Sequence, residues 1–177
     1  MSTGPSLKSR AVALLSRREY SRLTLARKLQ AHSDDEAEVS RLLDDLTREG
    51  WLSDARFAQS VVHRRARTHG ASRVAHDLRQ SGIAEDAVAT IRQTLRESEY
   101  DRAWEVWRKK FGSATPSVPE RQVSAESRDA ARQVYARQAR FLASRGFGHD
   151  VIRQVLARSH QDDDTVDDDR YGDSDDS

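Results

Sequence analysis

The chain has 177 residues, of which 33% are charged and 36% hydrophobic, so thin cores with wide polar faces are expected. It contains no cysteine, which excludes disulfides, thiol nucleophiles and zinc–cysteine sites and is consistent with a reducing compartment. No run of 18 apolar residues occurs, and the first ten residues, MSTGPSLKSR, lack the apolar core of a signal peptide. The sequence therefore predicts a cytoplasmic protein without a membrane span.

The formal net charge of +1 conceals an uneven distribution along the chain. The last 17 residues, from Gln161, hold nine aspartates and one arginine, whereas the preceding 160 residues hold 29 Lys and Arg against 20 Asp and Glu. A basic body predicts contact with a polyanion or with an acidic protein surface. The acidic tail, 160–177, is predicted from its composition to be disordered. Solubility is the favoured role of such a tail, and competition with DNA or partner acids for the basic face is the alternative.

The first part of the chain predicts a disordered N-terminus, 1–8, and a three-helix repeat, 9–53. Its first helix is expected at 9–19. A break at Tyr20-Ser21 leads to the second helix, and the third is expected at 36–49. Apolar residues of the last helix recur with the helical period of 3.6 residues and mark its buried face: Val39, Leu42, Leu43 and Leu46.

Glycines mark the joints that lead into and through a second three-helix repeat, 54–97. Gly50 suits a helix C-terminus, where positive φ is needed, and Trp51 follows it as an apolar anchor. Ser53 and Asp54 are suited to the start of the next helix as cap and first-turn acid. Further breaks are expected at Gly70 and Gly82.

A third repeat, 98–159, is predicted to contain a proline-bearing loop, 113–124. Its helices are expected from Ser98 to Gly112, at 125–145 and at 149–158, and the middle one predicts an inward face of Ala131, Val134, Tyr135, Gln138 and Leu142. In the second repeat, Gly82-Ile83 follows four and five residues after Leu78. In the third, Gly146-Phe147 follows at the same offsets after Leu142. The predicted fold is all-α, with three tandem three-helix repeats in an elongated, curved array.

Arginines on the predicted outer faces of the second and third repeats are the candidate partner- or DNA-binding residues. The planar guanidinium makes bidentate contacts with phosphates and carboxylates alike. For any single arginine, a solvated helix face or an i,i+4 pair is the favoured explanation. The excess of basic residues in the body weakens this explanation for the set. The candidates are Arg56, Arg64, Arg67, Arg73, Arg79, Arg140 and Arg145.

The three tryptophans, Trp51, Trp104 and Trp107, have two interpretations. Exposed, they would be platforms on which nucleic-acid bases stack. Their helical spacing and the place of Trp51 beside Gly50 favour packing in the core.

Nothing in the sequence predicts an enzyme, a cofactor or a metal site. The histidines have no metal-binding spacing, and nucleophile and nucleotide-binding motifs are missing from the sequence. Residues 22–50 also fit a helix-turn-helix, so the alternative is a DNA-binding module that acts through this element or through non-specific backbone contact. Asp44, Asp45 and Glu49 on the second of these helices oppose that interpretation because they would repel phosphate.

A set of short motifs resembles the RecX family, the bacterial regulators of the RecA recombinase. The resemblance covers roughly residues 9–158 and is carried by Gly50-Trp51, Asp54-x-Arg56-Phe57-Ala58, Arg64-Arg65, Gly70-x-x-Arg73 with Leu78 and Gly82-Ile83, Arg140-Phe141-Leu142 and Arg145-Gly146-Phe147.

This resemblance implies three tandem three-helix repeats in a curved molecule. It also implies binding in the helical groove of the RecA–single-stranded DNA filament. We further expect a monomer, and any direct contact with DNA is expected to be weak. The expected function is regulatory: inhibition of RecA recombinase, ATPase and co-protease activity, and so regulation of DNA repair and the SOS response. The family brings no catalytic residues with it.

Overall fold

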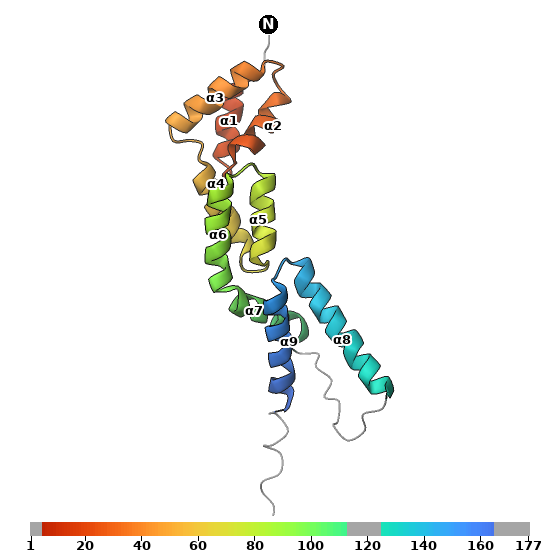
Figure 1. The fold of residues 1–177 in the computed structure, drawn as a ribbon. Coiled ribbons are helices and arrows are strands. Elements are labelled where there is room, and N and C mark those ends of the chain that lie inside the picture. The colour runs from red at the N-terminus through yellow and green to blue at the C-terminus, as the bar shows by residue number, and fades with distance from the viewer. Residues whose placement is uncertain (1–4, 113–124, 165–177) are drawn as a thin grey trace, which may run out of the picture. The chain divides into compact units, whose positions relative to one another are not determined.

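The structure, a computed structural model, describes residues 5–112 and 125–164. Within these ranges the chain forms nine helices and no strand, which confirms the predicted all-α fold (Figure 1). The first four residues, the predicted loop 113–124 and the tail from 165 lie outside the described residues. The helices are α1 (Leu7–Leu15), α2 (Arg22–Gln30), α3 (Glu36–Arg48), α4 (Asp54–Arg65), α5 (Ala71–Gln80), α6 (Glu85–Glu97), α7 (Glu99–Phe111), α8 (Ala125–Ser144) and α9 (His149–Asp164).

Two helices differ from their predicted bounds by more than one residue. α1 begins at Leu7, ahead of the predicted Ser9, because the Ser6 hydroxyl caps it by accepting a hydrogen bond from the Ser9 nitrogen at 3.2 Å. It ends at Leu15 rather than at Glu19. α9 continues to Asp164 instead of ending at Arg158, since neither glycine nor proline interrupts 159–164. The boundaries between the three repeats and their curved arrangement stay predictions.

The helices form two compact units, each of which has its own core. Unit 1 comprises Met1–Ala66 and Val74–Thr94. In α2 and α3 the side chains of Leu25, Leu29 and Leu46 have no exposed surface, and each such burial stabilises the fold by roughly 1.5–3 kcal/mol. Further buried residues of unit 1 include Ala11, Val39, Leu43, Phe57, Ala58, Val74, Leu78 and Val88.

Polar contacts fix the start of α2 against later helices of unit 1. Ser21 is fully buried, and its hydroxyl contacts both the Thr24 nitrogen at 3.1 Å and the Ser81 carbonyl oxygen at 2.6 Å. The Thr24 hydroxyl in turn accepts from the Ser21 nitrogen, which completes a capping box. The Asp54 carboxylate accepts a hydrogen bond from the Arg22 nitrogen at 2.7 Å. The N-terminus of α2 is thus held from α4 and from the end of α5.

Unit 2 comprises Arg67–Arg73 and Leu95–Ser177, and aromatic residues of α7 dominate its core. The Trp104 and Trp107 rings stack with centroids 5.1 Å apart, and Phe111 meets Phe141 edge-on at 5.2 Å. The buried Trp107 ring nitrogen donates to the Gln138 side-chain oxygen at 3.1 Å. The aliphatic part of this core consists of Ala103, Val106, Leu142, Val151, Ile152, Val155 and Leu156.

The turn before α5 is tied to α7 and to the turn between α8 and α9, all inside unit 2. The buried carboxylate of Glu99 accepts a hydrogen bond from the Ala71 nitrogen at 2.8 Å and so caps α5 from another helix. The Arg102 guanidinium donates to the carbonyl oxygens of His69 at 2.7 Å and Leu95 at 2.6 Å. Partial burial lowers the pKa of Arg102 below its ordinary value.

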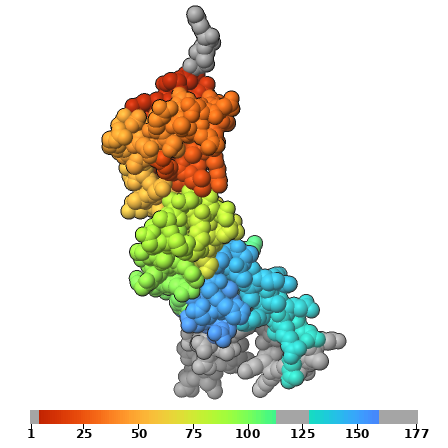
Figure 2. Space-filling model, turned by 45° about the horizontal axis from the view of Figure 1, so that its top comes forward, coloured from red at the N-terminus to blue at the C-terminus, as the bar shows by residue number. Residues whose placement is uncertain are grey.

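Four residues predicted to lie inside are exposed. Ala131, Val134 and Tyr135 of α8 lie at the surface, because no described segment covers the first half of this helix, which is drawn in teal in Figure 2. Trp51 is 47% exposed, because Leu52 rather than Trp51 enters the core after Gly50. In the part of the chain that the structure describes, every helix is too short or too polar to span a membrane.

Candidate functional site

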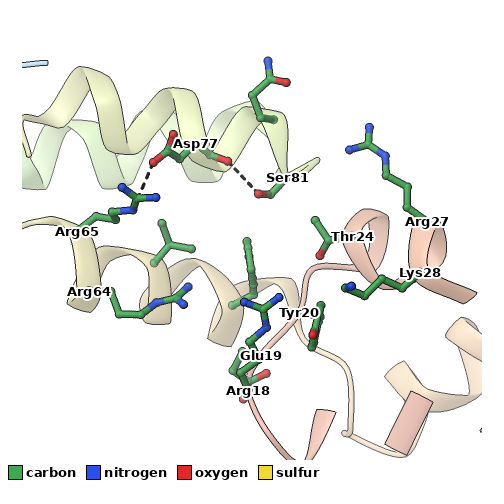
Figure 3. Close-up of a pocket in the computed structure, with 13 residues that line it drawn as sticks. Arg18, Glu19, Tyr20, Thr24, Arg27, Lys28, Arg64, Arg65, Asp77 and Ser81 are labelled. Atoms are coloured by element: carbon green, nitrogen blue, oxygen red, sulfur yellow. Dashed lines mark hydrogen bonds and ion pairs between the residues drawn. The ribbon is translucent and has the colours of Figure 1, made fainter. Parts of the chain in front are cut away.

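An open groove of about 700 Å³ lies on unit 1 and has a cationic rim (Figure 3). We call it the basic groove. It is lined by the segment before α2, by α2 itself, and by α4 and α5. Its cationic residues are Arg18, Arg27, Lys28, Arg64 and Arg65, and its remaining residues are Glu19, Tyr20, Thr24, Phe57, Val61, Asp77, Gln80 and Ser81.

The cations of the basic groove stand where the local helix structure favours them. Arg27 and Lys28 are in the last turn of α2, and Arg64 and Arg65 are in the last turn of α4. Positive charge in the last turn of a helix is stabilised by the negative end of the helix dipole. Since α2 contains no acidic residue, its cations are not offset within their own helix.

Both carboxylates of the basic groove are already engaged. Glu19 accepts a hydrogen bond from the Arg56 side chain at 2.9 Å, and Asp77 lies 3.7 Å from the Arg65 side chain (Figure 3). Within the described ranges, Arg27, Lys28 and Arg64 form no ion pair. The groove therefore presents positive charge that its own acidic residues do not balance.

The floor of the basic groove is apolar. Tyr20, Phe57 and Val61 are each at least nine-tenths buried, so they form a packed base rather than free aromatic surface. The Arg18 guanidinium lies over the Tyr20 ring, 4.5 Å from its centroid. The groove thus combines an apolar floor with a charged rim.

Of the seven candidate arginines, three belong to unit 1 and only Arg64 lines the basic groove. Arg56 donates to the carbonyl oxygens of Gly50 and Trp51, both at 3.0 Å, besides its contact with Glu19. It therefore holds the turn that carries the exposed indole of Trp51.

Arg79 forms a two-pronged contact with Glu85, whose Oε2 atom accepts from the arginine Nε at 2.7 Å. This hydrogen bond is the main cause of a raised pKa of Arg79 and of a lowered pKa of Glu85. Both residues are exposed, so the pair contributes little stability.

The other four candidates lie in unit 2. Arg145 donates to the Thr68 carbonyl oxygen at 3.2 Å and lies 4.5 Å over the Phe141 ring, so it supports the turn before α5. The exposed Arg140 donates to the Ala136 carbonyl oxygen on its own helix at 3.2 Å. Arg67 and Arg73 are exposed.

Sequence reasoning missed Arg18, Arg27 and Lys28, which the fold brings to Arg64. The available signal was local: residues 22–30 contain three basic and no acidic side chains. In the alternative helix-turn-helix segment, the three acids that oppose DNA binding are each paired with a basic residue: Asp44 with Arg22, Asp45 with Arg48 and Glu49 with Lys8. Among the residues with described side chains, no group of three or more His, Asp or Glu is placed to hold a metal ion.

The fold and the groove define an all-helical protein with three-helix domains and a basic surface site. The sequence matches the RecX second three-helix domain over residues 53–91 and the RecX third three-helix domain over 120–156. A regulatory protein RecX of Leptothrix cholodnii is 46% identical over 151 residues, or 85% of this chain and 87% of that protein. Another, of Chromobacterium violaceum, is 43% identical over 90% of this chain and 95% of its own length.

The fold agrees with a solved relative. The crystal structure of RecX from Lactobacillus salivarius matches with a TM-score of 0.67 at 19% identity, over 88% of this chain and 95% of that one. The chain belongs to the RecX family of regulatory proteins. This confirms the family that the motifs indicated.

Proposed function

We propose that this protein binds the RecA–DNA filament in the cytoplasm and inhibits RecA recombinase, ATPase and co-protease activity, and so regulates homologous recombination, DNA repair and the SOS response. The observation that carries the proposal is membership of a regulatory family over 85% of the chain. The surplus of positive charge in the basic groove supports it, because a protein–DNA filament is an acidic partner.

The proposed mechanism is bridging of successive RecA protomers by one helical protein. Several modest contacts on one body act together, because each contact raises the effective concentration of the next. A bridged filament cannot readily add protomers or admit a second duplex. Of the seven candidate arginines, Arg64, Arg67 and Arg140 have the clearest binding role, since they are exposed and no acidic residue of the described chain pairs with them.

The direct test is fluorescence anisotropy of labelled single-stranded DNA, with and without RecA and a slowly hydrolysed ATP analogue. The expected result is strong binding only to the assembled filament. Equal binding to bare DNA, with a steep dependence on salt, would contradict the proposal and favour a DNA-binding module.

A charge-reversal variant tests the residues. The triple variant Arg64→Glu, Arg67→Glu, Arg140→Glu should inhibit strand exchange at least tenfold less than the unaltered protein, with an unchanged helical circular dichroism spectrum. The control is Arg41→Glu on α3. Arg41 is exposed, and its guanidinium lies 3.9 Å from the Asp35 carboxylate. Unchanged inhibition by the triple variant would remove these residues from the proposed interface.

A further inference from the structure

We infer that the basic groove of unit 1 binds an acidic polypeptide segment that carries an apolar side chain, and not a nucleic-acid backbone. The inference rests on the proposed function for the identity of the partner, since the segment would belong to RecA in the filament. The chemistry of the groove itself comes from unit 1 alone.

The rim of the groove is suited to carboxylates. Arg27 and Arg64 offer planar guanidinium groups, which bind carboxylates through two parallel hydrogen bonds, and Lys28 adds a point charge. These three cations come from two helices and face one opening (Figure 3). Because Glu19 and Asp77 are occupied by Arg56 and Arg65, they do not neutralise this rim.

The floor of the groove is suited to an apolar side chain. Phe57 and Val61 form its base, and a volume of about 700 Å³ leaves room for more than one side chain of a bound segment. Protein–protein interfaces combine an apolar centre with a polar rim in this way.

One observation disfavours a nucleic acid in this groove. The Tyr20 ring is buried and covered by Arg18, so it cannot stack on a base, and stacking on aromatic side chains is one of the two sources of affinity for single strands.

The probe is a fluorescein-labelled peptide, Gly-Asp-Glu-Phe-Asp-Glu-Leu-Asp-Asp-Gly, whose binding to the full chain is measured by anisotropy. The double variant Arg27→Glu, Arg64→Glu should bind it at least tenfold more weakly, and Arg41→Glu should bind it as the unaltered protein does. A peptide with serine in place of its Phe and Leu should bind at least threefold more weakly. Equal peptide binding by the double variant would overturn the inference.

An oligothymidine of similar total charge serves as competitor. It is expected to displace the peptide only at a large excess. If the oligothymidine displaces the peptide at equimolar concentration, and the double variant binds neither of them, the groove is assigned to nucleic acid instead. Circular dichroism and the urea midpoint verify that the double variant folds.

Filament binding measured in parallel separates the two hypotheses. If the unaltered protein binds the peptide through Arg27 and Arg64 but does not bind the filament, the proposed function fails and the chemistry of the groove stands. If it binds the filament and the double variant binds it equally well, the inference fails and the proposed function stands.

Discussion

The backbone nitrogen of Gly70 donates a hydrogen bond to the carbonyl oxygen of Arg145 at 2.9 Å, and the two turns that carry these residues touch. A Cβ atom on Gly70 would lie 2.2 Å from the Gly146 carbonyl oxygen. Within unit 2, therefore, the turn before α5 and the turn before α9 are joined by backbone atoms in direct contact.

This contact predicts that Gly70→Ala is strongly destabilising. The methyl group must push the two turns apart and weaken their hydrogen bond, so we expect a loss of about 3 kcal/mol, at the upper end for overpacking. Urea denaturation followed by circular dichroism measures it. A loss below about 1 kcal/mol would show that the turns move apart freely.

A second prediction compares two glycines of nearly equal conformation, Gly50 with a φ of 78° and Gly146 with a φ of 80°. A Cβ atom on Gly50 meets nothing within 4 Å, whereas one on Gly146 would lie 2.5 Å from the Arg73 Cβ atom. Gly50→Ala should therefore lower the free energy of unfolding by only about 1 kcal/mol, because alanine disfavours the left-handed conformation. Gly146→Ala should cost about 2 kcal/mol more, because crowding adds to it. Equal losses in urea denaturation would contradict the close packing of Gly146.

A third prediction concerns two helix caps. Ser21→Ala should destabilise by about 2 kcal/mol, because it removes the cap of α2 and leaves the Ser81 carbonyl oxygen without its buried partner. The control, Ser53→Ala, removes a single capping bond of 3.3 Å at α4 and should cost about 1 kcal/mol or less. If Ser53→Ala lowered the urea midpoint more than Ser21→Ala does, the contact with Ser81 would contribute nothing.

A fourth prediction is a pKa. The hydrogen bond from Arg79 lowers the pKa of Glu85, so the pair stabilises the folded state above the ordinary glutamate pKa of about 4.3 and loses this effect as the pH falls through the lowered value. NMR titration of the Glu85 carboxyl carbon should show the low pKa, and Arg79→Gln should return it to the ordinary range. Arg92→Gln should change it less, because Arg92 contributes least to the shift.

The sequence was sufficient to predict the helices because their signals are local. Apolar periodicity placed the buried face of α3, and the joints at Gly50, Gly82 and Gly146 have the positive φ that glycine permits. Ala131, Val134, Tyr135 and Trp51 were predicted wrongly for the same reason. A period shows which side chains share a face, but only the tertiary structure decides whether another segment covers that face.

The candidate site was less predictable than the helices. Arg56 and Arg145 are of the residue type that binds anions, yet Arg56 donates to the carbonyl oxygen of Gly50 in the preceding turn and Arg145 to that of Thr68, 77 residues earlier in the chain. No spacing rule encodes these contacts. The basic groove depends on Arg27 and Arg64 meeting across unit 1, and this follows from packing that periodicity does not specify.

The exposed indole of Trp51 makes the protein its own spectroscopic reporter. The chain has three tryptophans, of which Trp107 is buried and Trp104 is packed between Trp107 and the Arg158 guanidinium, 4.3 Å from its ring centroid. A water-soluble quencher such as iodide should therefore reach Trp51 most easily. A partner that covers the Gly50–Leu52 turn would shield this emission, and its arrival could be followed in unlabelled protein.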